Sequence, residues 1–228
     1  DGNFYSKYIP STGGRSDDWQ SLYYPGEAAL GLLMLYEKDP SDVWLNSAIK
    51  VLQYLGLIRM YGQNIPADHW ALLATEKLLS FKKNAKSPVP TKLLINHATQ
   101  ISASILQSQI ACDDMSERRG GFSIHGHVTP TATRLEGLLA SHSIIPPENE
   151  LRKHIETAIP CGISFLIRAQ IRAGIYQGAF PRTIRNEDQD IGRTEEILRR
   201  ATEVRIDYVQ HALSAMTRYL ELKKDNKI

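Results

Sequence analysis

The stretch Tyr23–Glu37, YYPGEAALGLLMLYE, constrains the fold more than any other part of the chain. Pro25 marks the beginning of a helix, because a proline in the first turn gives up an N–H that has no helical partner there. After Glu27 the residues are apolar at every helical position, so this helix has no polar face. A helix of that kind is enclosed by protein on all sides, and this one is far too short to span a bilayer. The sequence therefore predicts a fully enclosed inner helix with one charge, Glu27, at its mouth.

The rest of the chain alternates between apolar helical segments and segments that are apolar on one face only. Asp68 and Thr129 are candidate N-caps, and Pro130 is a second start signal of the kind seen at Pro25. No segment shows the alternation typical of strands, apart from a short hairpin expected within residues 3–9. Helices are predicted at residues 43–60, 68–81, 91–111, 131–143, 150–170 and 203–223.

The composition is that of an ordinary globular protein. Apolar residues make up 42% of the 228 residues, charged residues make up 23%, and the formal net charge is +2. No basic stripe stands out and no apolar segment is long enough to cross a bilayer, so we expect neither a nucleic-acid partner nor membrane insertion. Cys112 and Cys161 could form a single bridge, but two unpaired thiols are the expectation. The chain begins inside a loop motif, which suggests a processed chain or a fragment and leaves the compartment and the oligomeric state open.

A weak internal repeat joins the helices into pairs. In each copy a one-sided helix is followed by a Gly-aromatic loop and then by an apolar helix. The loop of the first copy contains Gly121-Phe122, and that of the second contains Gly178-Ala179-Phe180. Repeats of this kind bury their apolar faces only by stacking on neighbours, in a solenoid or in a closed ring.

This alternation resembles the α/α toroids, which include the six-hairpin glycosidases, their lyase and epimerase relatives, and the terpene cyclases and prenyltransferases. The resemblance covers nearly the whole chain at the level of architecture, and no segment matches a catalytic signature. It implies an all-α fold in which stacked helical hairpins form a partial toroid, with residues 1–228 as a single domain. In such folds the beginnings of the inner helices line the mouth of a central cavity.

Charged and aromatic residues gather at the beginnings of the apolar helices, where they would converge on one cleft. Glycoside hydrolysis needs two carboxylates, one protonated as an acid and the other ionised as a base or nucleophile. The aromatic rings would stack on sugar rings, and the arginines would receive an anionic substrate such as a uronic acid. The expected catalytic residues are Glu27, Asp68, Glu136 and Asp207. The expected substrate-binding residues are Tyr23, Tyr24, His69, Trp70, His125, His127, Arg134, Arg205 and Tyr208.

The same side chains have structural explanations. Acidic residues in a first helical turn are favoured by the helix dipole and by capping, and Asp68 suits an N-cap. Arg205 and Asp207 can pair with other charges. Cys112 and the histidines near it have the side chains that bind zinc, but their spacing matches no common zinc motif, so we expect no metal and no cofactor.

Two functional hypotheses follow. The first is a carbohydrate-active enzyme, a hydrolase, lyase or epimerase, that acts on a small-molecule or oligosaccharide ligand. The second is a non-catalytic helical scaffold that binds a peptide or protein in its concave face, since folds of this kind host many functions. Opposed carboxylates across an open cleft favour the enzyme, whereas carboxylates used in capping favour the scaffold. The acidic loop Glu187–Glu196 is predicted to be mobile and to border the cleft.

Overall fold

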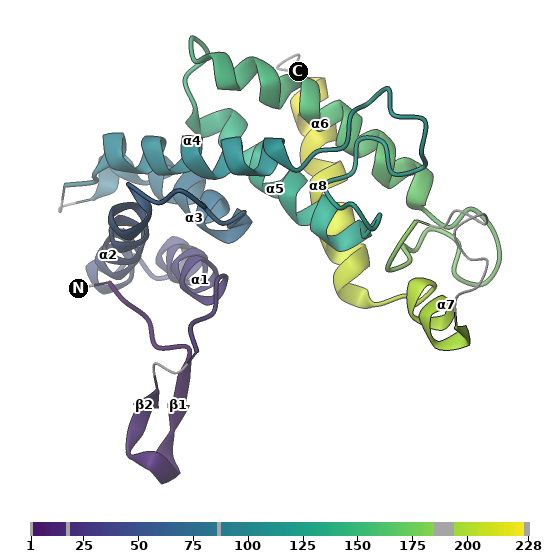
Figure 1. Ribbon diagram of the computed structural model, residues 1–228. Coiled ribbons are helices and arrows are strands. Elements are labelled where there is room, and N and C mark those ends of the chain that lie inside the picture. The colour runs from purple at the N-terminus through teal and green to yellow at the C-terminus, as the bar shows by residue number, and fades with distance from the viewer. Residues whose placement is uncertain (1, 17–18, 86–87, 185–193, 226–228) are drawn as a thin grey trace. The chain divides into compact units, whose positions relative to one another are not determined.

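The computed structural model is mostly helical (Figure 1). It describes residues 2–16, 19–85, 88–184 and 194–225, so most of the predicted mobile loop Glu187–Glu196 lies outside the described residues. The predicted all-α class is confirmed, whereas the toroid arrangement stays a prediction. The elements are β1 (Lys7–Ile9), the 3-10 turn η1 (Pro10–Thr12), β2 (Gly14–Ser16), α1 (Tyr24–Lys38), α2 (Asp42–Arg59), α3 (His69–Ser80), the 3-10 turn η2 (Lys82–Asn84), α4 (Thr91–Gln107), α5 (Val128–Ile144), α6 (Glu150–Ala169), α7 (Glu195–Ala201) and α8 (Ile206–Lys224).

The chain divides into two compact units. Unit 1 consists of Asp1–Ser104 and Ser143–Pro146, and unit 2 consists of Ile105–His142 and Pro147–Ile228. The expectation that residues 1–228 form a single domain stays a prediction. Among the described residues, no helix has the length and the hydropathy that crossing a bilayer requires.

In unit 1, α1 lies beside α2 and α3 (Figure 1). Ser41 Oγ accepts a hydrogen bond from Val43 N at the beginning of α2. The antiparallel hairpin of β1 and β2 precedes these helices, with Lys7 opposite Ser16 and Ile9 opposite Gly14. Only the first strand of this hairpin falls within the range expected from the sequence.

Helix α1 is not enclosed on all sides, so that expectation is wrong. Its buried residues are Gly26, Ala29, Leu33 and Tyr36, which recur every three or four positions and form one face. On the other side Met34 is 55% exposed and Leu35 is 41% exposed. The close approach to α3 is made at Gly26, where a Cβ atom would lie 2.6 Å from Ala71 N. Helix α1 therefore packs through one face, although its sequence is apolar all round.

In unit 2, a disulfide joins Cys112, in the loop after α4, to Cys161 in α6. The two Cα atoms are 5.8 Å apart and the cysteines are 49 residues apart in the sequence. The expectation of two unpaired thiols is therefore wrong. Gly120 has a φ of +77° and packs against the Cys161 backbone so closely that a Cβ atom would collide with it. The loop and α6 are thus held together by both a covalent bond and a tight backbone contact.

Helix α6 also approaches α5 closely. A Cβ atom at Gly162 would lie 2.7 Å from Leu135 Cδ2, so a larger residue there would require the Leu135 side chain to shift. Phe122 and Phe165 are fully buried beside this contact, and a Cβ at Gly162 would lie 3.1 Å from the ring of Phe122. The aromatic residue of the first Gly-aromatic loop is therefore part of the core of unit 2.

Candidate functional site

The loops of unit 2 place the beginnings of α5 and α8 against one shared segment, residues 181–184. Val128 N donates to Arg182 O at 2.9 Å, and Arg182 N donates to Glu203 O at 2.8 Å. Val128 is the first residue of α5, and Glu203 lies three residues before α8. Two helices predicted from the sequence to be inner helices therefore begin beside the same segment.

Farther along these helices, Glu136 of α5 and His211 of α8 come together. His211 Nδ1 lies 2.8 Å from Glu136 Oε2. Glu136 is 3% exposed, and the side chain of His211 is 13% exposed. Glu136 was expected in the opening turn of its helix, but α5 begins at Val128, so this residue lies in the third turn. Glu136 was expected from the sequence as a site residue, whereas His211 was not.

With Glu136 ionised, this contact favours one tautomer of the imidazole. An ionised carboxylate can only accept hydrogen bonds, so Nδ1 carries the proton and donates it to Glu136. In the neutral ring Nε2 is then the basic nitrogen. When Nε2 takes up a proton, the carboxylate behind the ring stabilises the imidazolium, as the aspartate does in a Ser-His-Asp triad. The pair therefore has the chemistry of an oriented general base.

The side chain of Arg134, which precedes Glu136 by two residues, contacts backbone carbonyl groups. Its Nη1 donates to Phe122 O at 2.8 Å and to Pro130 O at 3.4 Å. These bonds tie the loop before α5 to the first turn of the helix. The predicted role of Arg134 in receiving an anionic substrate stays a prediction.

Arg205 and Asp207 pair with each other at the beginning of α8. Arg205 Nε lies 3.0 Å from Asp207 Oδ1, and both side chains are exposed, at 57% and 38%. The neighbouring carboxylate raises the pKa of Arg205. The Arg205 guanidinium lies over the ring of Tyr208, whose hydroxyl donates to Glu203 Oε2 at 3.1 Å. Burial, together with this bond to Glu203, raises the pKa of Tyr208. The Asp207 carboxylate thus has an ion-pair partner two residues away.

His125 and His127 lie in the loop before α5, with ring centroids 5.6 Å apart. His125 is exposed, whereas His127 is partly buried and its Nδ1 lies 3.3 Å from Ser123 Oγ. Burial lowers the pKa of His127, and Arg182 lowers it further, so this ring is neutral at pH 7. Cys112 is bonded to Cys161, so its sulfur is not a thiolate ligand for zinc.

In unit 1, Asp68 is fully buried at the beginning of α3. Its Oδ1 accepts from Ala71 N at 3.0 Å, and its Oδ2 lies 2.8 Å from Arg59 Nη1. Burial raises the pKa of Asp68, and the attraction of Arg59 opposes that rise. The capping alternative is confirmed, because both carboxylate oxygens are engaged by the helix end and by Arg59. This geometry gives no support to Asp68 as a catalytic carboxylate.

The predicted aromatic residues of unit 1 do lie together. The ring of His69 makes an edge contact with Tyr23, with centroids 5.4 Å apart, and lies 4.9 Å from the ring of Trp70. The ring of Tyr24 makes an edge contact with the ring of Trp19, with centroids 5.7 Å apart. Trp19 was not among the site residues expected from the sequence. Tyr23, Tyr24 and Trp19 are between 43% and 49% exposed. These three residues offer partly exposed rings close to the beginning of α1.

Glu27 is exposed in the first turn of α1, where a negative charge is favoured by the helix dipole. The predicted convergence of Glu27 and His69 with Glu136 and Asp207 on one cleft joins residues of both units and stays a prediction. Within the units, the structure shows two neighbours that were not expected from the sequence: His211 beside Glu136, and Trp19 beside Tyr24. Comparison of the chain with models of protein families, with curated proteins and with solved structures found no match.

Proposed function

We propose that the protein is a carbohydrate-active enzyme of the lyase or epimerase type, with His211 as its general base and Glu136 as the group that orients it. The observation that carries this proposal is the 2.8 Å contact between the buried Glu136 carboxylate and His211 Nδ1. An imidazole held in one tautomer by a carboxylate is suited to removing a proton at neutral pH. Within unit 1, the partly exposed rings of Tyr23, Tyr24 and Trp19 present flat apolar faces with a polar edge, a surface suited to a sugar.

The reaction that fits this base is removal of the proton next to the carboxylate of a uronic acid. Nε2 of His211 takes the C5 proton, and the electron pair of the C–H bond moves into the sugar carboxylate. Return of a proton to the opposite face gives the C5 epimer. Cleavage of the C4–O4 bond, in which O4 leaves with the bonding electrons and takes up a proton from solvent, gives the 4,5-unsaturated sugar instead. Both outcomes share the first step, so they share the base.

Hydrolysis by two carboxylates has weaker support. Such a mechanism needs an acid and a base or nucleophile opposed across the glycosidic bond. Asp68 is used in capping α3 and in pairing with Arg59, and Asp207 pairs with Arg205. Glu136 itself is engaged by His211. The carboxylates that the sequence marks as catalytic are thus mostly in contact with basic groups, which suits proton abstraction better.

The test follows deuterium incorporation at C5 by NMR, with uronic-acid oligosaccharides and neutral oligosaccharides in D₂O. Deuterium incorporation follows proton removal and return of a deuteron to C5, so it detects an epimerase. A lyase is detected in the same spectra by loss of the H5 signal and appearance of the alkene proton at C4. We expect one of these two changes with the uronic acids, and its rate should fall about 100-fold or more in His211→Gln. Glu136→Gln should also lose rate, because a neutral amide can donate to the ring and reverse its tautomer. Asp207→Asn, a change to a carboxylate of the same unit outside the pair, should retain the rate.

Melting temperatures separate this proposal from a purely structural pair. If His211→Gln and Glu136→Gln mainly lower the melting temperature, and no sugar exchanges its C5 proton, then the pair is a structural buried contact. Binding of a peptide without any exchange would favour the helical scaffold.

A further inference from the structure

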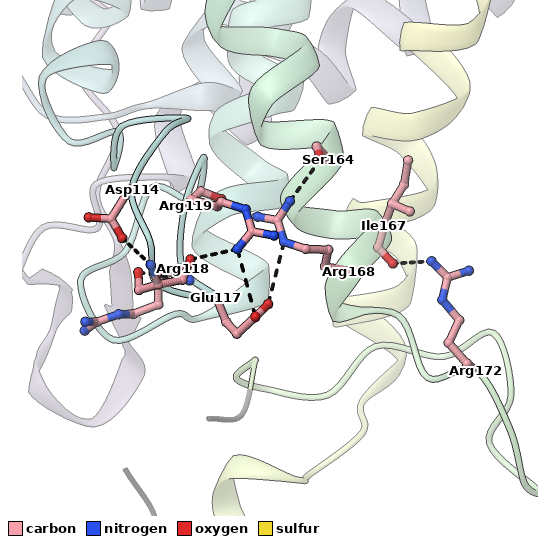
Figure 2. Close-up of polar contacts among 9 residues, drawn as sticks. Asp114, Glu117, Arg118, Arg119, Ser164, Ile167, Arg168 and Arg172 are labelled. Carbon is pink, nitrogen blue, oxygen red and sulfur yellow. Dashed lines mark hydrogen bonds and ion pairs between the residues drawn. The ribbon is translucent and has the colours of Figure 1, made fainter. Parts of the chain in front are cut away.

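A second cluster of charged residues lies elsewhere in unit 2, where the loop after Cys112 meets α6. Figure 2 shows Glu117 placed between the guanidinium groups of Arg119 and Arg168. Glu117 Oε1 lies 3.9 Å from Arg119 Nη1, and Glu117 Oε2 lies 3.9 Å from Arg168 Nε. Both distances exceed that of a hydrogen bond, so one carboxylate faces two cations without bonding to either.

Both guanidinium groups are held in place by other contacts. Arg168 Nη1 donates to Ser164 Oγ at 2.9 Å, and its Nη2 donates to Arg119 O at 2.5 Å. Arg119 Nη1 donates to Ser116 O at 3.2 Å. The loop carrying Arg119 is in turn anchored to α6 by the disulfide at Cys161. Each guanidinium group is therefore held by contacts other than Glu117.

The cluster has donor capacity in excess of its acceptors. Arg168 Nε is buried and makes no hydrogen bond among the described residues, although it points toward Glu117 (Figure 2). Burial lowers the pKa of Arg168, and the neighbouring Arg119 lowers it further. Two guanidinium groups and one carboxylate leave a net charge of +1. An oxyanion with oxygens at about 2.8 Å from these nitrogens would satisfy both donors better than Glu117 does.

We propose that Arg119 and Arg168 form a binding site for the carboxylate or sulfate group of a ligand, and that Glu117 occupies this place when no ligand is bound. Glu117 is 49% exposed in its side chain, so it can move into solvent without breaking a buried contact. The oxyanion then accepts from Arg168 Nε and from Arg119, in the fork geometry that guanidinium groups provide. That the oxyanion belongs to a sugar acid rests on the proposed function, whereas the site itself does not.

Isothermal titration at low ionic strength tests the site, with sodium sulfate and sodium glucuronate as probes and sodium chloride and glucose as controls. We expect sulfate, glucuronate or both to bind, and the controls not to. Binding of sulfate alone identifies the ligand group as a sulfate ester, and binding of glucuronate alone identifies it as a carboxylate. If neither binds, the proposal is overturned.

Three variants locate the binding. Arg168→Lys keeps the charge but loses Nε and the fork, so affinity should fall about tenfold. Glu117→Gln removes the competing carboxylate, so affinity should rise. Arg172→Lys is the matched control, because Arg172 Nη2 donates to Ile167 O and takes no part in the cluster (Figure 2). If Arg168→Lys binds the probes with unchanged affinity, the proposal is overturned. Arg119→Lys takes the place of this variant if Arg168→Lys does not fold.

These experiments are independent of catalysis. Sulfate binding that Arg168→Lys weakens supports the oxyanion site even if no sugar exchanges its C5 proton. Conversely, C5 exchange that His211→Gln abolishes supports the proposed function even if sulfate and glucuronate fail to bind at Arg168.

Discussion

His97 of unit 1 makes the stability of this protein depend on pH in a way that one substitution can remove. The residue lies in α4 and is 1% exposed. Its Nε2 is 3.4 Å from Arg59 Nη1, so the ring must be neutral there to accept a hydrogen bond from the guanidinium. Burial, together with the charge of Arg59, lowers the pKa of His97 from 6.5 to about 3.

The size of the effect follows from these two pKa values. The folded-state pKa lies below the unfolded value, so protons bind preferentially to the unfolded chain, and stability is lost as the pH falls from about 6.5 toward 3. Between pH 7 and pH 5 the unfolded chain gains about 2 kcal/mol from protonation at His97, because its pKa there is about 6.5. His97→Gln retains an oxygen that can accept from Arg59 but has no titrating group.

Urea unfolding at pH 7 and pH 5, followed by circular dichroism, measures this difference. Wild type should lose about 2 kcal/mol more than His97→Gln over this interval. Arg59 and Asp68 are present in both proteins, so their own titration cancels in the comparison. His154→Gln, at an exposed position of α6, is the control and should behave as wild type does. If His97→Gln keeps the whole pH dependence of wild type, the buried neutral histidine is not its source.

Two further predictions concern packing and the disulfide. Gly26→Ala should destabilise unit 1 by about 1–3 kcal/mol, because its Cβ would lie 2.6 Å from the α3 backbone. Gly31→Ala on the same helix meets nothing within 4 Å and should stabilise the protein by up to about 1 kcal/mol. Urea unfolding measures both changes in the free energy of unfolding, and changes of the same sign in the two variants would contradict the packing argument. The double variant Cys112→Ser/Cys161→Ser should lower the free energy of unfolding by about 4 kcal/mol, as expected for cysteines 49 residues apart. Because Cys112 is exposed, reductant should destabilise wild type but not this variant. Equal responses of wild type and the variant to reductant would refute this prediction.

Local signals predicted most of the helices. Pro25 falls in the first turn of α1, and Asp68 caps α3 as expected. The N-cap expected at Thr129 is wrong, because α5 already begins at Val128, and α7 (Glu195–Ala201) was not predicted. These signals act through the backbone of a few neighbouring residues, so the sequence alone contains them. The disulfide is different, because its cysteines are 49 residues apart and nothing near either one marks the other as its partner.

Burial around α1 could not be predicted from its composition. An apolar run indicates which side chains favour burial, but the number of neighbouring helices decides how many of those side chains are buried. Here α2 and α3 contact one face, and Met34 and Leu35 remain exposed. Exposed apolar side chains are common on folded proteins, so a helix that is apolar all round need not be an inner one.

The candidate carboxylates lie at different positions in their helices, and these positions indicate which of them have a structural explanation. Asp68 precedes α3 and Asp207 lies in the first turn of α8, where unpaired N–H groups and the helix dipole favour an acid whatever the protein does. Glu136 is in the third turn of α5, between Leu135 and Leu138, where no helix end favours a charge and burial opposes one. A buried glutamate at such a position needs a specific partner, and His211 is that partner. The signal for this buried contact was therefore present in the sequence as a lone acid inside an apolar helix, whereas acids in the opening turns are typical of helix caps.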